Sequence, residues 1–353
     1  MKDNFKSIKD EIIAILCTSV AIIIFMVILP TTVITKGSSK IKDKSEDKTA
    51  MSNMSNMSNM SSSSEIKFSG EEMIDVYITS TGKIEKISIE DYVCGVVASE
   101  MPAEFHSEAL KAQAIASRTY LTSKAVNNCI NGHGADICDS VHCQVYKSKE
   151  ESIAKWDESK AEYYWNKIEE AVRATAGQVM SYNGELVMYP QFFATSSGNT
   201  ENSVDANWGD IPYLKSVSSE GEESAPKYES EKSVPIEEFV NSINIKYPEA
   251  NVDINSIASD ISVLSRSEAG GVKNLKLGDE EIKGSEFRFL VGLNSTNFTY
   301  IIKEDEIIFN CKGYGHGVGM SQWGANAMAK RGENYQAIIK HYYTGVDISN
   351  LKF

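Results

Sequence analysis

Apolar residues recur at helical spacing in the stretch that ends at Pro102. The residues that share one helix face are Ile89, Tyr92, Val93, Val96 and Val97. Ser88 and Asp91 are suited to capping the start of this helix. Because a proline disfavours helical geometry at the residue before it, we expect the helix to end near Glu100. The pattern therefore predicts a buried helix whose last residue is a carboxylate.

Further periodic segments predict helices and strands in an irregular order. Helices are expected near residues 107–126, 150–176, 235–247, 321–331 and 334–343. Strands are expected near residues 73–79, 83–87, 179–193, 261–264, 287–293 and 300–310, with Asn183-Gly184 as a hairpin turn. Since no regular βαβ alternation is present, the order is typical of an α+β fold of mixed helices and antiparallel strands.

An apolar run near the N-terminus predicts a membrane anchor. Residues 12–34 are long enough to cross a bilayer as one transmembrane helix, behind a short tail of residues 1–11. A cleaved signal peptide is the alternative, but no small-x-small cleavage site closes the run. Lysines flank both ends, so charge alone does not orient the anchor. We expect the large C-terminal part to lie outside the cytoplasm.

Polar low-complexity sequence separates this anchor from the folded part. Residues 35–65 are rich in Ser, Lys and Asp and contain a repeated Met-Ser-Asn triplet, which cannot build a packed core. They are interpreted as a disordered linker. Residues 66–353 form the expected two-lobed ectodomain, within which residues 218–279 are interpreted as an insertion or second lobe.

The formal net charge of −14 narrows the classes of molecule that this protein is expected to bind. Acidic residues are spread along the folded part and no basic stripe is present, which excludes nucleic acid as the expected partner. A strongly anionic polymer is disfavoured for the same reason. A neutral polysaccharide is compatible with this charge.

The predicted surroundings of Glu100 suit proton donation. The negative end of the helix dipole and the apolar neighbours both favour the neutral acid over the carboxylate. A surface glutamate that merely ends a helix is the simpler interpretation of the local sequence. Glu104 and Glu108 are alternative acids, but they lie outside the apolar helix end.

Cysteines and histidines cluster in the loop after the second predicted helix. His133, Cys138, His142 and Cys143 form a Cys₂His₂ set, which is a complete tetrahedral zinc complement and therefore indicates a structural site. His142 and Cys143 can share a metal only on a loop, because neighbours on a strand point apart. Cys129 could replace either histidine. A disulfide, most easily Cys138–Cys143, is the alternative outside the cytoplasm.

Two motifs of small residues suit a glycan-binding groove. In the first, Ser196 and Ser197 follow a strand and can offer hydroxyl groups to sugar, although simple turn chemistry is equally consistent. A serine nucleophile lacks the nucleophile-elbow pattern. In the second, four alternating glycines indicate close backbone packing that presents His316, Gln322 and Trp323 to a groove. A phosphate loop is disfavoured because no Lys-Ser/Thr follows.

Six motifs occur in order along the chain. They are Val97-Ala-Ser-Glu-Met-Pro102, Ser117-Arg-Thr-Tyr120, Asp136-x-Cys-Asp-Ser-x-His-Cys-Gln-Val-Tyr146, Phe193-Ala-Thr-Ser-Ser-Gly-Asn-Thr200, Pro212-Tyr-Leu-Lys215 and Gly313-Tyr-Gly-His-Gly-Val-Gly-Met-Ser-Gln-Trp-Gly-Ala325. Together they resemble the stage II sporulation protein D (SpoIID) family. The resemblance runs from about Met73 to the C-terminus, and the anchor and linker match the layout of the family.

The resemblance implies a membrane-anchored lytic transglycosylase of endospore formation. Such proteins cut peptidoglycan glycan strands, preferably strands stripped of stem peptides, while the mother-cell membrane engulfs the forespore. They act with the SpoIIP amidase and the SpoIIM membrane protein. The catalytic residue implied is Glu100, substrate-binding roles fall on Arg118, Tyr213 and Lys215, and some members hold zinc in the segment that matches residues 133–143.

The chemistry of such an enzyme needs one carboxylic acid rather than the pair that a glycoside hydrolase uses. Glu100 would protonate the glycosidic oxygen and then accept the proton of the C6 hydroxyl, giving a 1,6-anhydro-N-acetylmuramic acid end. The nearest alternative is a non-catalytic glycan-binding enhancer of a cell-wall amidase. A zinc amidase or peptidase is less consistent with four clustered ligands, which leave no open position.

Overall fold

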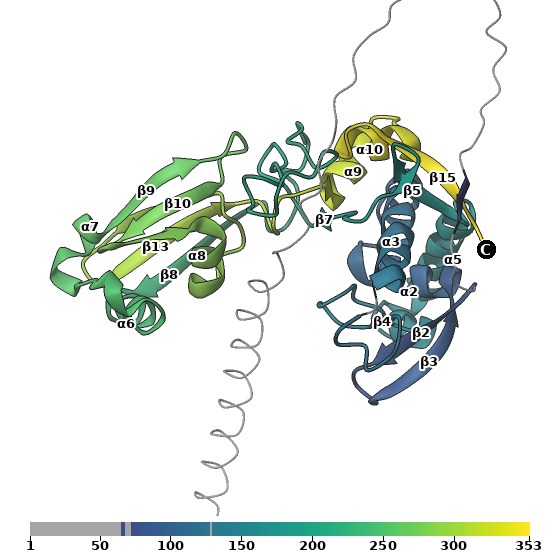
Figure 1. Ribbon diagram of the computed structural model, residues 1–353, viewed down its shortest axis with the longest axis horizontal. Helices are drawn as coiled ribbons and strands as arrows, with labels where there is room; N and C mark the ends of the chain where they lie inside the picture. The colour runs from purple at the N-terminus through teal and green to yellow at the C-terminus, as the bar shows by residue number, and fades with distance from the viewer. Residues whose placement is uncertain (1–64, 68–71, 128) are drawn as a thin grey trace, which may run out of the picture. The chain divides into compact units, whose positions relative to one another are not determined.

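The computed structural model describes residues 65–67, 72–127 and 129–353 (Figure 1). The predicted N-terminal tail and transmembrane anchor, and all of the predicted linker but its last residue, lie outside the described residues. Within the described ranges, no helix combines the length and the apolar character needed to cross a bilayer.

The helix that ends at Glu100 forms as the sequence predicts. Helix α2 spans Ile89–Glu100, and the backbone N–H of Asp91 donates to the Ser88 hydroxyl at 3.1 Å. Met101 has extended geometry, with φ −121° and ψ 145°, so the chain leaves the helix directly before Pro102. The strands β2 (Met73–Ile78) and β3 (Lys83–Ser88) form an antiparallel hairpin ahead of α2, and β4 (Ile137–Cys138) runs parallel to β2.

Helices and a second sheet complete the first hydrophobic core. The helices are α3 (Ser107–Asn127), α4 (Lys149–Ile153), α5 (Glu158–Arg173), α9 (Gln322–Lys330) and α10 (Tyr335–Tyr342). The sheet has the order β1 (Glu65–Lys67), β15 (Val346–Lys352), β5 (Gln178–Tyr182) and β6 (Glu185–Leu186). The predicted turn Asn183-Gly184 joins β5 to β6, and both residues have positive φ. The single helix predicted over residues 150–176 is two helices, because Asp157 caps the start of α5.

A second hydrophobic core is built by residues from Val234 to Cys311. One sheet has the order β12 (Phe298–Ile302), β13 (Glu306–Lys312) and β8 (Glu229–Pro235), and the other β11 (Glu280–Lys283), β10 (Val272–Leu277) and β9 (Ile261–Arg266). The helices α6 (Ile236–Lys246), α7 (Ile257–Asp260) and α8 (Gly284–Val291) belong to this part (Figure 1). The segment 218–279, interpreted as an insertion or second lobe, covers the first half of it.

The strand predicted at residues 287–293 is wrong, because this segment is helix α8 and the turn that ends it. Phe287 and Val291, four residues apart, are both buried, whereas Phe289 between them is exposed. The apolar residues that resembled an alternating strand pattern therefore lie on both the buried and the exposed sides of a short helix. The helix ends at Gly292, which has the left-handed conformation. With helices interspersed among several small sheets, the class is α+β as expected.

The segment with alternating glycines runs alongside the segment that contains the serine motif. β14 (Met320–Ser321) pairs in parallel with β7 (Phe192–Phe193), and isolated bridges extend the contact. A Cβ atom on Gly319 would lie 2.0 Å from the carbonyl oxygen of Gln191, and the φ of Gly319 is +82°. Both observations confirm that this motif serves close backbone packing.

Candidate active site and metal cluster

Glu100 ends α2 in a largely buried position between two other segments. The backbone N–H of Val145 donates to Glu100 Oε1 at 3.3 Å, and the side chain of Gln322 also donates to the carboxylate. Burial raises the pKa of Glu100, and the two hydrogen bonds oppose this rise without cancelling it. The site therefore favours the neutral acid while holding the carboxyl group in one orientation.

The two alternative acids have the opposite electrostatic environment. The hydroxyl of Tyr164 donates to Glu104 at 2.7 Å and lowers its pKa. Burial raises the pKa of Glu108, but hydrogen bonds from Lys111 and the Tyr335 backbone lower it overall. Of the three predicted candidates, Glu100 alone has a raised pKa.

Gln322 reaches Glu100 because it begins α9 directly after its N-cap. The hydroxyl of Ser321 accepts from the Gly324 backbone at 3.2 Å and sets the start of the helix. The Gln322 side chain also donates to Gln113 of α3 at 3.5 Å. The Trp323 ring packs edge-on against Phe105, with ring centres 4.9 Å apart. The structure thus brings Gln322 together with Glu100, although Gln322 is buried and not open to solvent.

Arg118 lies near the opposite end of α2 from Glu100. Its side chain is fully buried and binds both carboxylate oxygens of Glu90, with Nε donating at 2.9 Å. It also donates to the carbonyl oxygens of Gln178 and Val172. Since Glu90 precedes Glu100 by nearly three helical turns, this geometry ties α2, α3, α5 and β5 together and presents no guanidinium to a ligand at Glu100.

Tyr213 and Lys215 occupy different environments although they are two residues apart. Tyr213 is buried, and its hydroxyl accepts from the Tyr189 backbone at 3.0 Å. Burial raises the pKa of this hydroxyl. The ammonium of Lys215 is partly exposed and lies 2.6 Å from a carboxylate oxygen of the well-exposed Asp210. Lys215 is therefore the more accessible of the two for substrate contact.

A fully buried carboxylate explains the serine motif, and sequence reasoning missed it. Glu222 accepts five hydrogen bonds, from the hydroxyl groups of Thr195, Ser196, Ser219 and Ser321 and from the Ser196 backbone. The distances run from 2.5 to 3.0 Å. The Ser196 hydroxyl is therefore already hydrogen-bonded within the protein. The signal that could have found Glu222 is the concentration of hydroxyl donors, which implies a buried acceptor.

Ser197 and His316 make contacts other than those that Ser196 makes with Glu222. The Ser197 hydroxyl donates to the Ala269 carbonyl oxygen at 3.2 Å. The His316 ring lies 4.8 Å from the Trp208 ring, and its Nδ1 accepts from the Val318 backbone at 3.1 Å. The predicted groove residues therefore divide between the surroundings of Glu100, the Glu222 network and a region beside Trp208.

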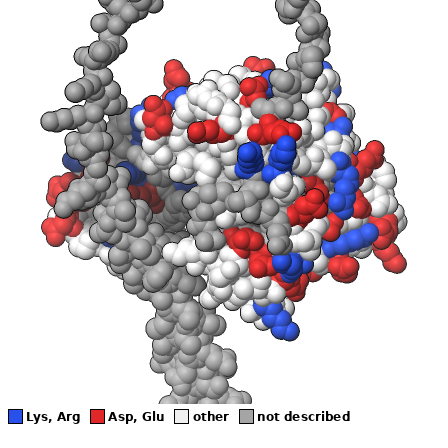
Figure 2. Space-filling model, turned by 45° about the vertical axis from the view of Figure 1, so that its right-hand side comes forward, with Lys and Arg blue, Asp and Glu red and all other residues white. Residues whose placement is uncertain are grey.

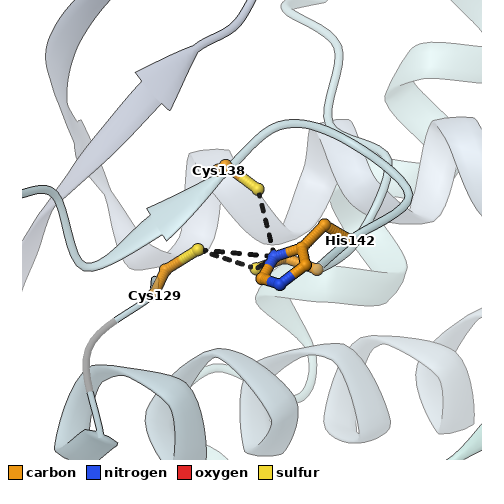
Figure 3. A group of neighbouring side chains, drawn as sticks. Cys129, Cys138 and His142 are labelled. Carbon is orange, nitrogen blue, oxygen red and sulfur yellow. Dashed lines mark hydrogen bonds between the residues drawn. The ribbon is translucent and has the colours of Figure 1, made fainter. Parts of the chain in front are cut away.

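Three cysteines and one histidine converge in the loop after α3. The thiols of Cys129 and Cys138 point toward the His142 ring (Figure 3), and the four ligand atoms, including Cys143 Sγ, lie within 4.8 Å of one another. His142 Nδ1 lies 3.6, 3.7 and 3.4 Å from the sulfurs of Cys129, Cys138 and Cys143. A tetrahedral zinc ion would place sulfur and nitrogen about 3.6 Å apart and two sulfurs about 3.8 Å apart. The donor set therefore fits zinc.

The ligand set differs from the predicted one at a single position. Cys129 completes the cluster in place of His133, whose ring instead lies 4.4 Å from that of Tyr77. The backbone turn that bonds Cys143 N–H to the Ser140 carbonyl allows His142 and Cys143 to face one point. All five cysteines of the described residues are free, and the sulfurs of Cys129 and Cys143 are 3.4 Å apart, too far for a disulfide.

We expect Cys129→Ser to lower the zinc content of the purified protein from one ion per chain toward none. A closed four-ligand site loses much of its affinity for zinc when one thiolate ligand is removed. His133→Ala is the matched control and should retain full metal content. Elemental analysis of both variants after dialysis measures the difference. Metal loss in His133→Ala with retention in Cys129→Ser would contradict the ligand set seen here.

Charged side chains of both signs lie on the surface of the described part. On the face shown in Figure 2, acidic and basic residues of the described part are interspersed.

The fold and the site define an α+β protein with a largely buried carboxylic acid, Glu100, at a helix end and a separate Cys₃His cluster. A family model described as "SpoIID: Stage II sporulation protein" matches residues 77–182. The chain is 40% identical over 279 residues to stage II sporulation protein D of Bacillus subtilis, covering 78% of each chain, and 39% identical to that of Bacillus amyloliquefaciens over the same shares. It is also 28% identical over 308 residues to the amidase enhancer of Bacillus subtilis, covering 72% of this chain and 40% of that protein. This chain belongs to the SpoIID family of sporulation proteins.

Proposed function

We propose that this protein is a lytic transglycosylase that cleaves peptidoglycan glycan strands during sporulation. The observation that carries the proposal is Glu100, a largely buried carboxyl group with a raised pKa and two fixed hydrogen-bond donors. A buried acid is suited to protonate a leaving oxygen near neutral pH. No second carboxylate is required, because an oxygen of the substrate itself completes the reaction.

In the first half of the proposed reaction, the Glu100 acid gives its proton to the glycosidic oxygen, and the bond from that oxygen to C1 breaks. In the second half, the C6 hydroxyl oxygen of N-acetylmuramic acid bonds to C1, and its proton returns to the Glu100 carboxylate. The Gln322 amide and the Val145 N–H stabilise the carboxylate that exists between the two transfers. The products are a free hydroxyl end and a 1,6-anhydro end, with no water consumed.

Zinc would act on the structure rather than on the bond that breaks. Cys129, Cys138, His142 and Cys143 would hold the ion, and as a closed ligand set they leave no position for a reacting water. When bound, the metal would cross-link the loop that carries Val145. This argues against a zinc amidase or peptidase.

The family and the predicted N-terminal anchor suggest a cellular setting, which we include in the proposal. The catalytic part would face the space outside the mother-cell cytoplasm, held to the engulfing membrane by residues 12–34. Glycan strands stripped of stem peptides would be the substrate, with the SpoIIP amidase and the SpoIIM membrane protein as partners. Lys215, with its exposed ammonium, is the best placed of the predicted arginine, tyrosine and lysine for substrate contact.

A non-catalytic glycan-binding enhancer of an amidase is the second candidate. It is favoured by the similarity to the amidase enhancer of Bacillus subtilis. The buried environment of Glu100 favours catalysis, because an acid with a raised pKa has no evident use in a purely structural glycan-binding face.

The test of catalysis is the mass of the products. Peptide-free glycan strands incubated with the full-length protein should yield fragments lighter by one water than hydrolysis products, because the 1,6-anhydro ring replaces a hydrated end. Mass spectrometry separates the two classes. Hydrated ends alone would mean a hydrolase, and strands that are bound but uncut would support the enhancer.

A further inference from the structure

A cavity of about 290 Å³ lies where residues 201–208 and 315–316 meet residues of the second core. Glu100 is not among the residues that line it. The lining side chains with polar, charged or aromatic groups include Glu201, Asp205, Trp208, Arg288, Phe289 and His316. Mixed aromatic and hydrogen-bonding walls of this kind are typical of ligand sites.

Glu201 is a buried acid without a full set of partners. Its side chain is only 8% exposed, and among the described residues its Oε2 atom has no hydrogen-bond partner. A Cβ atom on Gly317 would lie 2.7 Å from Glu201 Cγ, and one on Gly271 would lie 2.2 Å from Oε1. The two glycines thus make room for the Glu201 carboxyl group. A buried carboxyl oxygen without a hydrogen bond costs stability, so a hydrogen-bond donor to Oε2 is missing.

Two aromatic side chains that line the same cavity are exposed and can contact a ligand. Trp208 is 40% exposed and Phe289 is 77% exposed, although large apolar side chains are usually covered. The Arg288 guanidinium lies 5.3 Å from the Phe289 ring centre, and the His316 ring lies 4.8 Å from the Trp208 ring. A partly exposed indole beside hydrogen-bonding groups suits stacking on the apolar face of a pyranose ring.

Charges around the cavity are balanced. Asp205 forms an ion pair of 2.5 Å with Lys273, and the lining contains one further acid, Glu201, and one further cation, Arg288. Burial, aided by the charge of Arg288, lowers the pKa of His316 to about 4, so the ring is neutral at pH 7. A balanced site favours a neutral, hydroxyl-rich ligand over a phosphate or a polycation.

We propose that this cavity is a second glycan-binding subsite, in which Trp208 stacks on one N-acetylated pyranose unit while Glu201 accepts, and Arg288 donates, hydrogen bonds to its polar groups. The inference rests on the proposed substrate class, but not on cleavage. His316 precedes Gln322 by six residues, which span at most roughly 20 Å of extended chain. The separation of the two places is therefore within the length of a short oligosaccharide, and in the proposal the subsite would hold the strand while the distant acid acts.

Binding is measured apart from cleavage by using full-length protein that carries Glu100→Gln. The probe is the β-1,4-linked tetramer of N-acetylglucosamine, titrated by calorimetry. Trp208→Ala should weaken binding about tenfold, the effect of losing about 1.4 kcal/mol of stacking. Trp208→Phe should retain most of the affinity, because a ring remains. Glu201→Gln should weaken binding severalfold, since an amide replaces part of the acceptor.

Tyr163→Ala is the matched control, because Tyr163 is an exposed aromatic residue of α5 outside the cavity. It should bind the tetramer as the parent does. The midpoint of thermal unfolding of each variant should match that of the parent. If Trp208→Ala loses both binding and the folded state, Trp208→Phe provides the test, because it keeps an aromatic ring in a folded protein. Equal affinity of Trp208→Ala and the parent, or no binding by any protein, would overturn the subsite.

The subsite and the proposed function fail in different ways. If the wild type cuts strands through Glu100 but Trp208→Ala leaves affinity and KM unchanged, cleavage stands and the subsite falls. If the tetramer binds through Trp208 but strands are never cut, the subsite stands and the transglycosylase falls.

Discussion

Replacing Glu100 with glutamine is expected to reduce the rate of glycan-strand cleavage by a factor of about 10²–10⁴, the usual contribution of a positioned general acid. Glutamine keeps the size of the side chain and can still accept the Val145 N–H bond, but it has no proton of suitable acidity to transfer. The variant should bind strands as the wild type does, so kcat falls while KM changes little. Release of 1,6-anhydro ends, followed by mass spectrometry, measures the change.

The pH dependence of the same reaction has a definite sign. The acid must be protonated to act, and burial raises the pKa of Glu100, so activity extends to higher pH than for an exposed glutamate and then falls as pH rises through that pKa. Stability carries the same sign: for an acid whose pKa is raised by folding, the stabilising contribution is present at low pH and is lost as pH rises through the folded-state pKa.

A stability control follows from this linkage. At pH 7 the Glu100→Gln protein should unfold at a temperature equal to or above that of the wild type, and the difference should shrink as pH falls. Loss of activity in a well-folded variant then identifies a chemical role. Glu104→Gln serves as the matched control, and it should retain activity because Tyr164 holds Glu104 as a stable carboxylate. If Glu100→Gln cuts strands at the wild-type rate, the proposed mechanism is wrong.

Glu222→Leu is expected to destabilise the protein by about 3–5 kcal/mol, because five hydrogen bonds end on this one buried carboxylate and each orphaned buried donor costs about 1–3 kcal/mol. Hydroxyl groups can rotate toward other acceptors, which keeps the total below the full sum. The midpoint of thermal unfolding should fall by roughly 10 °C. Differential scanning calorimetry measures the shift.

The same substitution should also affect the proposed active site. Ser321 donates to Glu222 and caps α9, so losing this bond releases the helix start that places Gln322 against Glu100. The exposed neighbour Glu223 provides the control, and Glu223→Leu should shift the midpoint by less than about 1 °C, as surface substitutions usually do. Equal effects of the two variants would show that the Glu222 network contributes little.

The sequence alone determined the elements whose signals are local. The helix that ends at Glu100, its Ser88 cap, its stop before Pro102 and the Asn183-Gly184 turn all follow from residues within a few positions of each other. Ordered motifs identified the SpoIID family, which the comparisons confirm. Local period was insufficient at residues 287–293, where a few apolar residues fit a strand and a short helix equally well.

Only the tertiary structure decided which distant side chains meet. It brought Cys129 rather than His133 to the cluster, placed Arg118 on Glu90 and directed five donors onto Glu222. The bond of Arg118 to Glu90 and most of those to Glu222 join residues far apart in the sequence, and the cluster depends on how an irregular loop turns, so no periodicity records them. Which acid becomes the proton donor likewise depends on burial, because Glu100 and Glu104 are the same residue type four positions apart and differ only in what surrounds them.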